Sequence, residues 1–173
     1  MADSLDKAKE VACELLGDRG YSMARVHIDE DMIVAEDDER GSILIVFINE
    51  NKLSVNTLKD VIAMCEDLQM RQLILVYKEV ITPSAKKTLE SIHTINVEQF
   101  ALAELMYNPT KHELSSKHEM ADPEEAESVK TKFGTHLPLL QRTDKMVRWY
   151  NYKPGSIIRV TRPGGHVVYR LVK

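Results

Sequence analysis

Carboxylates and a lysine near residue 50 form the pattern with the most direct catalytic potential. Glu50-Asn51-Lys52 is an ExK triplet, and Asp37 and Asp38 precede it in the chain. Two-strand α/β nucleases place an Asp and a (D/E)xK triplet around a magnesium ion, because two carboxylates hold the metal and the lysine orients or activates water. The same residues also suit a plain turn, and such triplets are common by chance in a highly charged chain. A magnesium-dependent nuclease is therefore an alternative hypothesis and not the preferred one.

His112 and Glu113 begin a second possible metal-binding pattern, the HExxH signature of zinc proteases. That signature requires two histidines four positions apart, so that both lie on one face of a helix. Here Ser116 occupies the required position, and His118 would lie roughly 240° around a helix from His112. The spacing argues against a zinc site of this type.

Other catalytic patterns are missing from the sequence. It contains no G-x-S-x-G, no phosphate loop with GK(S/T), no GxGxxG and no aspartate cluster of the kind that holds magnesium in a polymerase. Cys13 and Cys65 are isolated, which favours two buried free thiols over a disulfide or a zinc site. We therefore predict no catalytic residue, no bound metal and no cofactor.

The stretch that begins at Thr82 offers groups suited to a phosphate contact. Pro83 fits the first turn of a predicted helix, and a helix N-terminus presents free N–H groups. Thr82 and Ser84 add hydroxyls, while Lys86 and Lys87 add positive charge. An N-capped helix with two solvated lysines explains the same residues without any ligand.

Charge is divided unevenly along the chain. Residues 1–109 carry 11 Lys and Arg against 20 Asp and Glu, whereas residues 110–173 carry 12 against 7. From Leu137 onward there are eight bases and one acid. These opposite signs predict two domains with different partners. The acidic balance of the first region argues against tight DNA binding by that region alone, while the basic end could meet nucleic acid or an acidic protein surface.

Hydrophobic spacing predicts the elements that position these residues. In residues 1–107 we expect an α/β sandwich with its sheet in the middle. Residues 42–48 form an apolar run typical of a strand buried on both faces, and the acidic run 29–40 is interpreted as a solvated loop. The predicted elements are helix 5–16, strand 21–28, strand 42–48, helix 53–68, strand 73–77, helix 83–92 and a strand or short helix over 95–105.

The turn chemistry of Asn108-Pro109 predicts a boundary between a domain of residues 1–107 and a smaller α+β domain of residues 108–173. In the second domain, an Asp-Pro pair predicts a helix start and a Pro-Gly-Gly turn predicts a β-hairpin. Its predicted elements are helix 122–133, helix 144–150 and strands 157–160 and 166–172.

No targeting or membrane segment is visible. No apolar run approaches the roughly 20 residues that span a bilayer. The N-terminal stretch carries acids where a secretory or mitochondrial leader would have bases. We therefore expect no membrane partner.

Several motifs along the chain also match the pattern of a known family. They are Asp18-Arg19-Gly20-Tyr21, Thr82-Pro83-Ser84-Ala85-Lys86-Lys87, His112-Glu113-Leu114, Leu137-Pro138, Lys153-Pro154-Gly155, Val160-Thr161-Arg162 and Val168-Tyr169-Arg170-Leu171-Val172. The chain resembles the fifth-largest subunit shared by the eukaryotic nuclear RNA polymerases, a family that includes a shorter archaeal counterpart. In that family the pattern His-Glu-Leu-Val-Pro-x-His fixes a strand and turn, whereas this chain has Ser115-Ser116 in place of Val-Pro.

The resemblance implies a non-catalytic subunit of a multisubunit DNA-directed RNA polymerase. It implies an N-terminal jaw domain of nuclease-like shape along the channel for downstream DNA, and a C-terminal assembly domain that docks on the largest subunit. The residues expected to face DNA are Thr82, Pro83, Ser84, Lys86 and Lys87. The residues expected at the subunit interface are Arg148, Trp149, Tyr150, Arg159, Arg162 and Tyr169.

The partners implied by the resemblance are the largest and other polymerase subunits, together with downstream duplex DNA held weakly within the complex. The chain is shorter than typical eukaryotic members, which would suit a compact homologue such as those of large DNA viruses. A cellular member is expected in the nucleus, and a viral one in the virion or a cytoplasmic viral factory. A free-standing DNA-binding module and the magnesium-dependent nuclease are the alternative functions.

Overall fold

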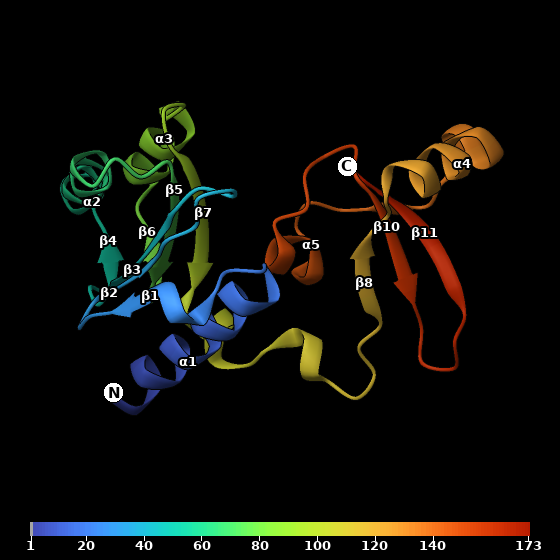
Figure 1. The fold of residues 1–173 in the computed structure, drawn as a ribbon. Coiled ribbons are helices and arrows are strands. Elements are labelled where there is room, and N and C mark those ends of the chain that lie inside the picture. Colours follow the sequence, from blue (N-terminus) through green and yellow to red (C-terminus); the bar gives the residue numbers. More distant parts are fainter. Residues whose placement is uncertain (1) are drawn as a thin grey trace. The chain divides into compact units, whose positions relative to one another are not determined.

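A computed structural model describes residues 2–173 of the chain. The polypeptide forms two compact units, the N-terminal unit Met1–Tyr107 and the C-terminal unit Asn108–Lys173. Both units combine helices with a sheet (Figure 1), which confirms the predicted α+β class. No helix among residues 2–173 is long and apolar enough to cross a membrane.

The N-terminal unit is built on a five-stranded mixed sheet. Its strands lie in the order β1 (Val26–Ile28), β2 (Met32–Ala35), β3 (Ile43–Ile48), β5 (Gln72–Tyr77) and β7 (Asn96–Ala101). The first three strands are antiparallel to their neighbours, while β3, β5 and β7 run parallel. The helical elements are α1 (Ala2–Asp18), η1 (Met23–Arg25), α2 (Val55–Asp67), α3 (Pro83–Ser91) and η2 (Leu102–Met106).

Helices cover both faces of this sheet. The helix α2 connects β3 to β5, and α3 connects β5 to β7, so the two crossovers proceed in the same direction and lie on the same face. One core cluster joins these helices to alternate strand residues, including Leu44, Leu58, Leu75 and Leu89. The other strand residues face the opposite side, where α1 buries its own apolar stripe (Figure 1). Because both faces are covered, all six residues of β3 are buried, as the apolar run predicts.

Two predictions in the N-terminal unit are wrong. The acidic run 29–40 is not wholly a loop, because β2 lies inside it with Ile33 and Ala35 buried against the core. Residues 21–28 are not one strand, because η1 precedes the three-residue β1. Flanking acids mask β2, and its strand conformation depends on the backbone partners that β3 provides.

The end of α1 is fixed by the Asp18-Arg19-Gly20-Tyr21 motif. Gly20 has φ +89°, a left-handed conformation that favours glycine, and the Tyr21 N–H donates to the Leu16 carbonyl at 2.9 Å. Arg19 then reaches β7, where its two terminal nitrogens each donate to one carboxylate oxygen of Glu98 at 2.8 Å. This bidentate pair is almost buried, with 6% and 15% of the two side chains exposed. The motif therefore ends the helix and also ties it to the sheet.

The C-terminal unit contains a four-stranded sheet. Its strands lie in the order β8 (Lys117–Met120), β10 (Ile157–Thr161), β11 (Val167–Val172) and β9 (Leu139–Leu140). Its helical elements are η3 (Pro109–Lys111), α4 (Pro123–Phe133), η4 (Gly134–His136) and α5 (Lys145–Tyr150). Asp122 caps α4 by accepting from the Glu125 N–H at 2.8 Å, and Asp144 caps α5 in the same way.

Alternation along β10 places two small cores on opposite faces of this sheet. Ile158 and Val160 pack with Val147 of α5, Leu140 and Val172. On the other face, β10 contributes to a second cluster that α4 covers. That cluster joins Ile157 to Val129 and Leu137, with Tyr169 and Leu171 against it. The two faces are the α5 face and the α4 face of the sheet.

Candidate functional site

The predicted DNA-facing stretch lies at the start of α3. Thr82 is the N-cap residue, and its hydroxyl oxygen accepts a hydrogen bond from the Ala85 N–H at 3.3 Å. The same hydroxyl donates to the Leu53 carbonyl at 3.0 Å. With both capacities used inside the chain, Thr82 positions the helix and its hydroxyl has no proton left for a phosphate.

The remaining residues of that stretch present an exposed positive surface. Pro83 occupies the first helical position, as predicted, and it is exposed together with Ser84, Lys86 and Lys87. The hydroxyl of Ser84 and the two lysine ammonium groups therefore lie at the positive end of the helix dipole. This arrangement could contact a phosphate but contains no enclosed binding site.

The N-terminus of α2 lies beside that of α3. The short strands β4 (Lys52–Leu53) and β6 (Val80–Ile81) pair in parallel immediately before the two helices. Ser54 caps α2 by accepting from the Thr57 N–H at 3.2 Å. The Thr57 hydroxyl donates to the two carboxylate oxygens of Glu50 at 3.1 and 3.3 Å. Glu50 of the ExK triplet is thus bound to the start of a helix, where a carboxylate is stabilised by the helix dipole.

The other carboxylates required for a nuclease lie at the opposite end of β3. Asp38 accepts from Arg25 at 2.7 Å, and Asp37 accepts from the Arg40 N–H at 2.6 Å; these contacts lower the pKa of both carboxyls. A six-residue strand separates them from Glu50 by roughly 17 Å, whereas magnesium binds its oxygen ligands at about 2.1 Å. These carboxylates cannot share one ion, so the nuclease alternative is not favoured.

His112 and His118 do not form a metal site. The Ser115 N–H donates to the His112 carbonyl at 2.8 Å, and His112 Nδ1 accepts from the Leu114 N–H at 3.1 Å. These bonds form a tight turn that leads into β8, where His118 Nδ1 lies 2.8 Å from the Ser116 carbonyl. No group of three His, Cys, Asp or Glu side chains within residues 2–173 could hold a metal ion. Both Cys13 and Cys65 are free thiols; Cys65 is buried as predicted, but Cys13 is only half-buried.

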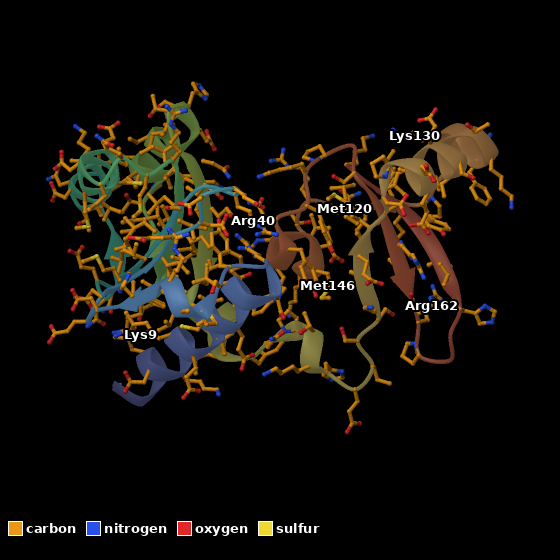
Figure 2. All side chains as sticks on the ribbon, in the orientation of Figure 1. Lys9, Arg40, Met120, Lys130, Met146 and Arg162 are labelled. Atoms are coloured by element: carbon orange, nitrogen blue, oxygen red, sulfur yellow. The ribbon has the colours of Figure 1, made fainter. Side chains whose placement is uncertain are left out.

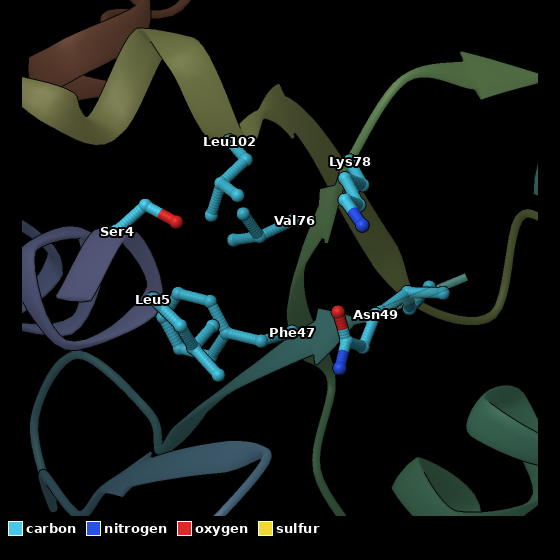
Figure 3. A pocket seen from close by; sticks show the side chains of 8 residues that line it. Ser4, Leu5, Phe47, Asn49, Val76, Lys78 and Leu102 are labelled. Carbon is cyan, nitrogen blue, oxygen red and sulfur yellow. The ribbon is translucent and has the colours of Figure 1, made fainter. Parts of the chain in front are cut away.

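Figure 3 shows a pocket in the N-terminal unit at the carboxyl ends of β3 and β5. Its polar lining comes from Ser4, Asn49 and Lys78, and apolar side chains complete it. The space is about 30 Å³. That volume holds about two water molecules and is far below the several hundred Å³ of a cofactor site.

On the C-terminal unit, Arg159 and Tyr169 are opposite residues of the β10–β11 hairpin. The Tyr169 hydroxyl donates to Glu125 Oε1 of α4 at 2.7 Å, and Arg159 Nη1 lies 3.7 Å from the same oxygen. The hydrogen bond to Glu125 raises the pKa of Tyr169. Arg159 Nε is buried without a hydrogen-bond partner, although nearly half of the side chain is exposed. The three side chains form a polar cluster on the α4 face.

The residues predicted on α5 lie on the other face of the sheet. Arg148 and Tyr150 are half-buried, and Trp149 is only 2% exposed. The Tyr150 ring stacks on Tyr152 with centroids 5.2 Å apart, and the Tyr152 hydroxyl donates to the His118 carbonyl at 3.0 Å. Burial raises the pKa of Tyr152. Trp149 is thus part of the core, and its expected place at the interface needs correction, since its ring offers almost no surface to a partner.

Arg162 lies at the tip of the hairpin. The Gly165 N–H donates to the Arg162 carbonyl at 2.9 Å, and the Arg162 N–H donates to the His166 carbonyl at 2.8 Å. Gly164 and Gly165 both have positive φ, as the Pro-Gly-Gly turn requires. Figure 2 shows the Arg162 side chain beside β10, and it is exposed. The six predicted interface residues therefore do not form one continuous surface, but divide between the two faces and the hairpin tip.

Comparisons with known proteins give the same family for both units. The family model for "RNA polymerase Rpb5, C-terminal domain" matches residues 107–172. The chain is 28% identical to "DNA-directed RNA polymerases I, II, and III subunit RPABC1" of Caenorhabditis briggsae, over 98% of this chain and 85% of that protein. It is 32% identical to the subunit of the same name from Dictyostelium discoideum, over 80% of this chain and 75% of that protein. The chain belongs to the RNA polymerase Rpb5 family.

The similarity to Rpb5 proteins extends to plant polymerases. "DNA-directed RNA polymerases IV and V subunit 5B" of Arabidopsis thaliana is 30% identical over 95% of this chain and 88% of that protein. These matches confirm the resemblance inferred from the motifs. They also agree with a non-catalytic polymerase subunit, because Rpb5 relatives are named as subunits of polymerase complexes.

Two features of this Rpb5 chain were missed by sequence reasoning. The buried pair of Arg19 and Glu98 joins residues 79 positions apart, and no local pattern indicates which acid Arg19 meets. The contact between Tyr169 and Glu125 likewise spans 44 positions. Arg19 lies within a motif that matches the family, and that was the single available signal.

Proposed function

We propose that this chain is a non-catalytic subunit of a multisubunit DNA-directed RNA polymerase. In this proposal the C-terminal unit is the assembly domain that docks on the largest subunit, and the N-terminal unit is the jaw domain along downstream DNA. The observation that carries the proposal is the match to named polymerase subunits over 98% of the chain, which includes both units. The sequence contains no catalytic motif that would favour an independent enzyme.

Docking is supported by exposed polar and basic groups on the C-terminal unit. Arg159 and Tyr169 on the α4 face and Arg162 at the hairpin tip are available to a partner. Arg148 and Tyr150 are half-buried on α5 and could contribute at its margin. Arginine and tyrosine are enriched where protein interfaces concentrate binding energy.

A DNA contact by the N-terminal unit is supported by the start of α3. Ser84, Lys86 and Lys87 offer a hydroxyl and two positive charges, while Thr82 and Pro83 set the position of that helix. The net acidity of this unit limits the contact to a weak one within the complex. The named relatives belong to polymerases of animals, amoebae and plants, so we expect a nuclear location rather than a viral one.

Affinity purification of the tagged full chain from its native cells tests the central proposal. The two large polymerase subunits are expected in the bound fraction by mass spectrometry, and the purified chain alone should neither cut nor tightly bind DNA. Absence of both large subunits would contradict the proposal. Magnesium-dependent nicking of plasmid DNA that Glu50→Ala abolishes would instead favour the nuclease.

The DNA contact is tested in a polymerase assembled with a variant chain. Lys86→Glu with Lys87→Glu is compared with Lys59→Glu with Arg71→Glu, a matched pair of exposed bases elsewhere on the same unit. If both lysines meet phosphates, the first pair should reduce the slope of log affinity against log salt by about 2. Equal slopes for the two pairs would remove the start of α3 from the DNA contact.

A further inference from the structure

Three backbone segments of the C-terminal unit meet at the carboxyl end of β11. The Arg142 N–H donates to the Lys173 carbonyl at 3.1 Å, which brings the loop after β9 to this point. The Gly155 N–H donates to the Val172 carbonyl at 2.9 Å, and the Val172 N–H donates to the Ser156 carbonyl at 3.0 Å. The turn after α5 therefore reaches the same corner of the sheet.

Each of the three segments contributes at least one base to this corner. Arg170 Nη1 donates to the Leu139 carbonyl at 3.4 Å, which directs the guanidinium towards β9. Lys153 Nζ donates to Asn151 Oδ1 at 2.9 Å. The set defined here as the basic corner consists of Arg142, Lys153, Arg170 and Lys173.

The positive charge of the basic corner has no counterpart among the described residues. Within residues 2–173, none of its four bases forms an ion pair, and the side-chain acceptors that they contact are neutral. Asp144 is the one acid after residue 137, but its carboxylate accepts from the Met146 N–H at 2.8 Å to cap α5. By contrast, Lys117 on β8 pairs with Glu119 at 2.8 Å. The basic corner is thus a local concentration of uncompensated charge.

We infer that the basic corner is a docking surface for an acidic segment of a partner protein. This inference rests on the proposed polymerase-subunit function and adds to it the chemistry of the contact. Arginine forks bind carboxylates bidentately, and complementary charge steers association and fixes register. A nucleic-acid backbone extends its charge far beyond one strand end and is repelled by a chain of net charge −4. A short acidic protein segment presents its charge locally and fits the compact corner.

A matched pair of charge reversals tests the inference. Arg142→Glu with Lys153→Glu changes the basic corner, while Lys130→Glu with Lys132→Glu makes the same change in charge on α4 (Figure 2 labels Lys130). Tagged full chains are purified from native cells with nuclease present, and the large polymerase subunits are quantified relative to the bait. The corner variant should recover at least about tenfold less of these subunits, corresponding to about 1.4 kcal/mol, and the α4 variant should match the wild type.

The outcomes separate the inference from the proposed function. Absence of large subunits with the wild-type chain overturns the proposed function and the inference together. Recovery with the wild type and equal recovery with both variants overturns the inference alone, as does recovery that disappears when nuclease is added. Arg142→Gln with Lys153→Gln should give an intermediate recovery with an unchanged thermal midpoint. If it lowers the midpoint and recovers no less than the wild type, the inference also fails.

Discussion

The two units of this Rpb5 chain differ in how they neutralise their arginines. In the N-terminal unit, arginines pair with carboxylates of the same unit, as in Arg19 with Glu98, Arg25 with Asp38 and Arg40 with Asp37. In the C-terminal unit, Arg142 and Arg170 contact backbone groups and no carboxylate among the described residues. Ion pairs within a unit serve its own structure, whereas unpaired bases are available to a partner. The comparison indicates that attachment is concentrated in the C-terminal unit.

Their cores differ in the same direction. The N-terminal unit covers both faces of a five-stranded sheet with three helices, and β3 is buried along its whole length. The smaller C-terminal unit divides its apolar residues between two separate clusters. Since smaller units bury a smaller fraction of their surface, the C-terminal unit should be the less stable of the two in isolation.

The largest expected effect comes from Trp149→Ala. Removing this buried ring should lower the free energy of unfolding of the C-terminal unit by about 3–5 kcal/mol, since it leaves a cavity in a small core. Hydrogen exchange with mass spectrometry should then show lost protection in residues 108–173 and unchanged protection in residues 1–107. Trp149→Phe retains more volume and should have a smaller effect. Equal loss of protection in both units would break the comparison, because the units would then unfold as one.

Arg19→Met tests the N-terminal unit in the converse way. It leaves the nearly buried carboxylate of Glu98 without its bidentate partner, which should destabilise that unit by about 3 kcal/mol. Urea unfolding followed by circular dichroism measures the change. Adding Glu98→Gln removes the uncompensated charge and should restore part of the loss. If the double variant is less stable than the single one, the pair is not the source of the effect.

Alkaline pH should distinguish the C-terminal unit through Tyr152. Because the folded state raises the pKa of this phenol, the unfolded chain loses its proton first, at about pH 10. The stabilisation is complete below that pH and is lost above it, by at most about 1.4 kcal/mol per pH unit. Tyr152→Phe should flatten the decline in stability of residues 108–173 between pH 9 and 11, measured by hydrogen exchange with correction for its intrinsic pH dependence. An unchanged slope would show that other groups cause the decline.

The smallest expected effect is that of Thr82→Ala. Loss of the N-cap at the start of α3 should destabilise the N-terminal unit by about 1 kcal/mol, with no effect on residues 108–173. Thermal unfolding compares it with Thr82→Ser, which keeps the capping hydroxyl and should be near neutral. A loss as large for serine as for alanine would mean that the methyl group, not the cap, matters.

Sequence reasoning succeeded where the signal was local. The run 42–48 predicts a buried strand, and β3 is that strand; the Pro-Gly-Gly turn predicts the hairpin that β10 and β11 form. It failed at Met32–Ala35, because a four-residue apolar stretch among acids becomes a strand only when a neighbour supplies its hydrogen bonds. For the candidate surfaces, residue types indicated which side chains could bind, but not which of them share a face.

By itself, the sequence determined the family, the mixed helix and strand content, the helix starts at Thr82, Asp122 and Asp144, and the basic character of the last segment. These follow from residue types a few positions apart, where capping, turn chemistry and periodicity act. Tertiary structure alone decided that Trp149 is core, that Asp37 and Glu50 lie at opposite ends of β3, and that the bases of the basic corner converge. Those outcomes depend on strand pairing and alternation, which join residues far apart in the chain.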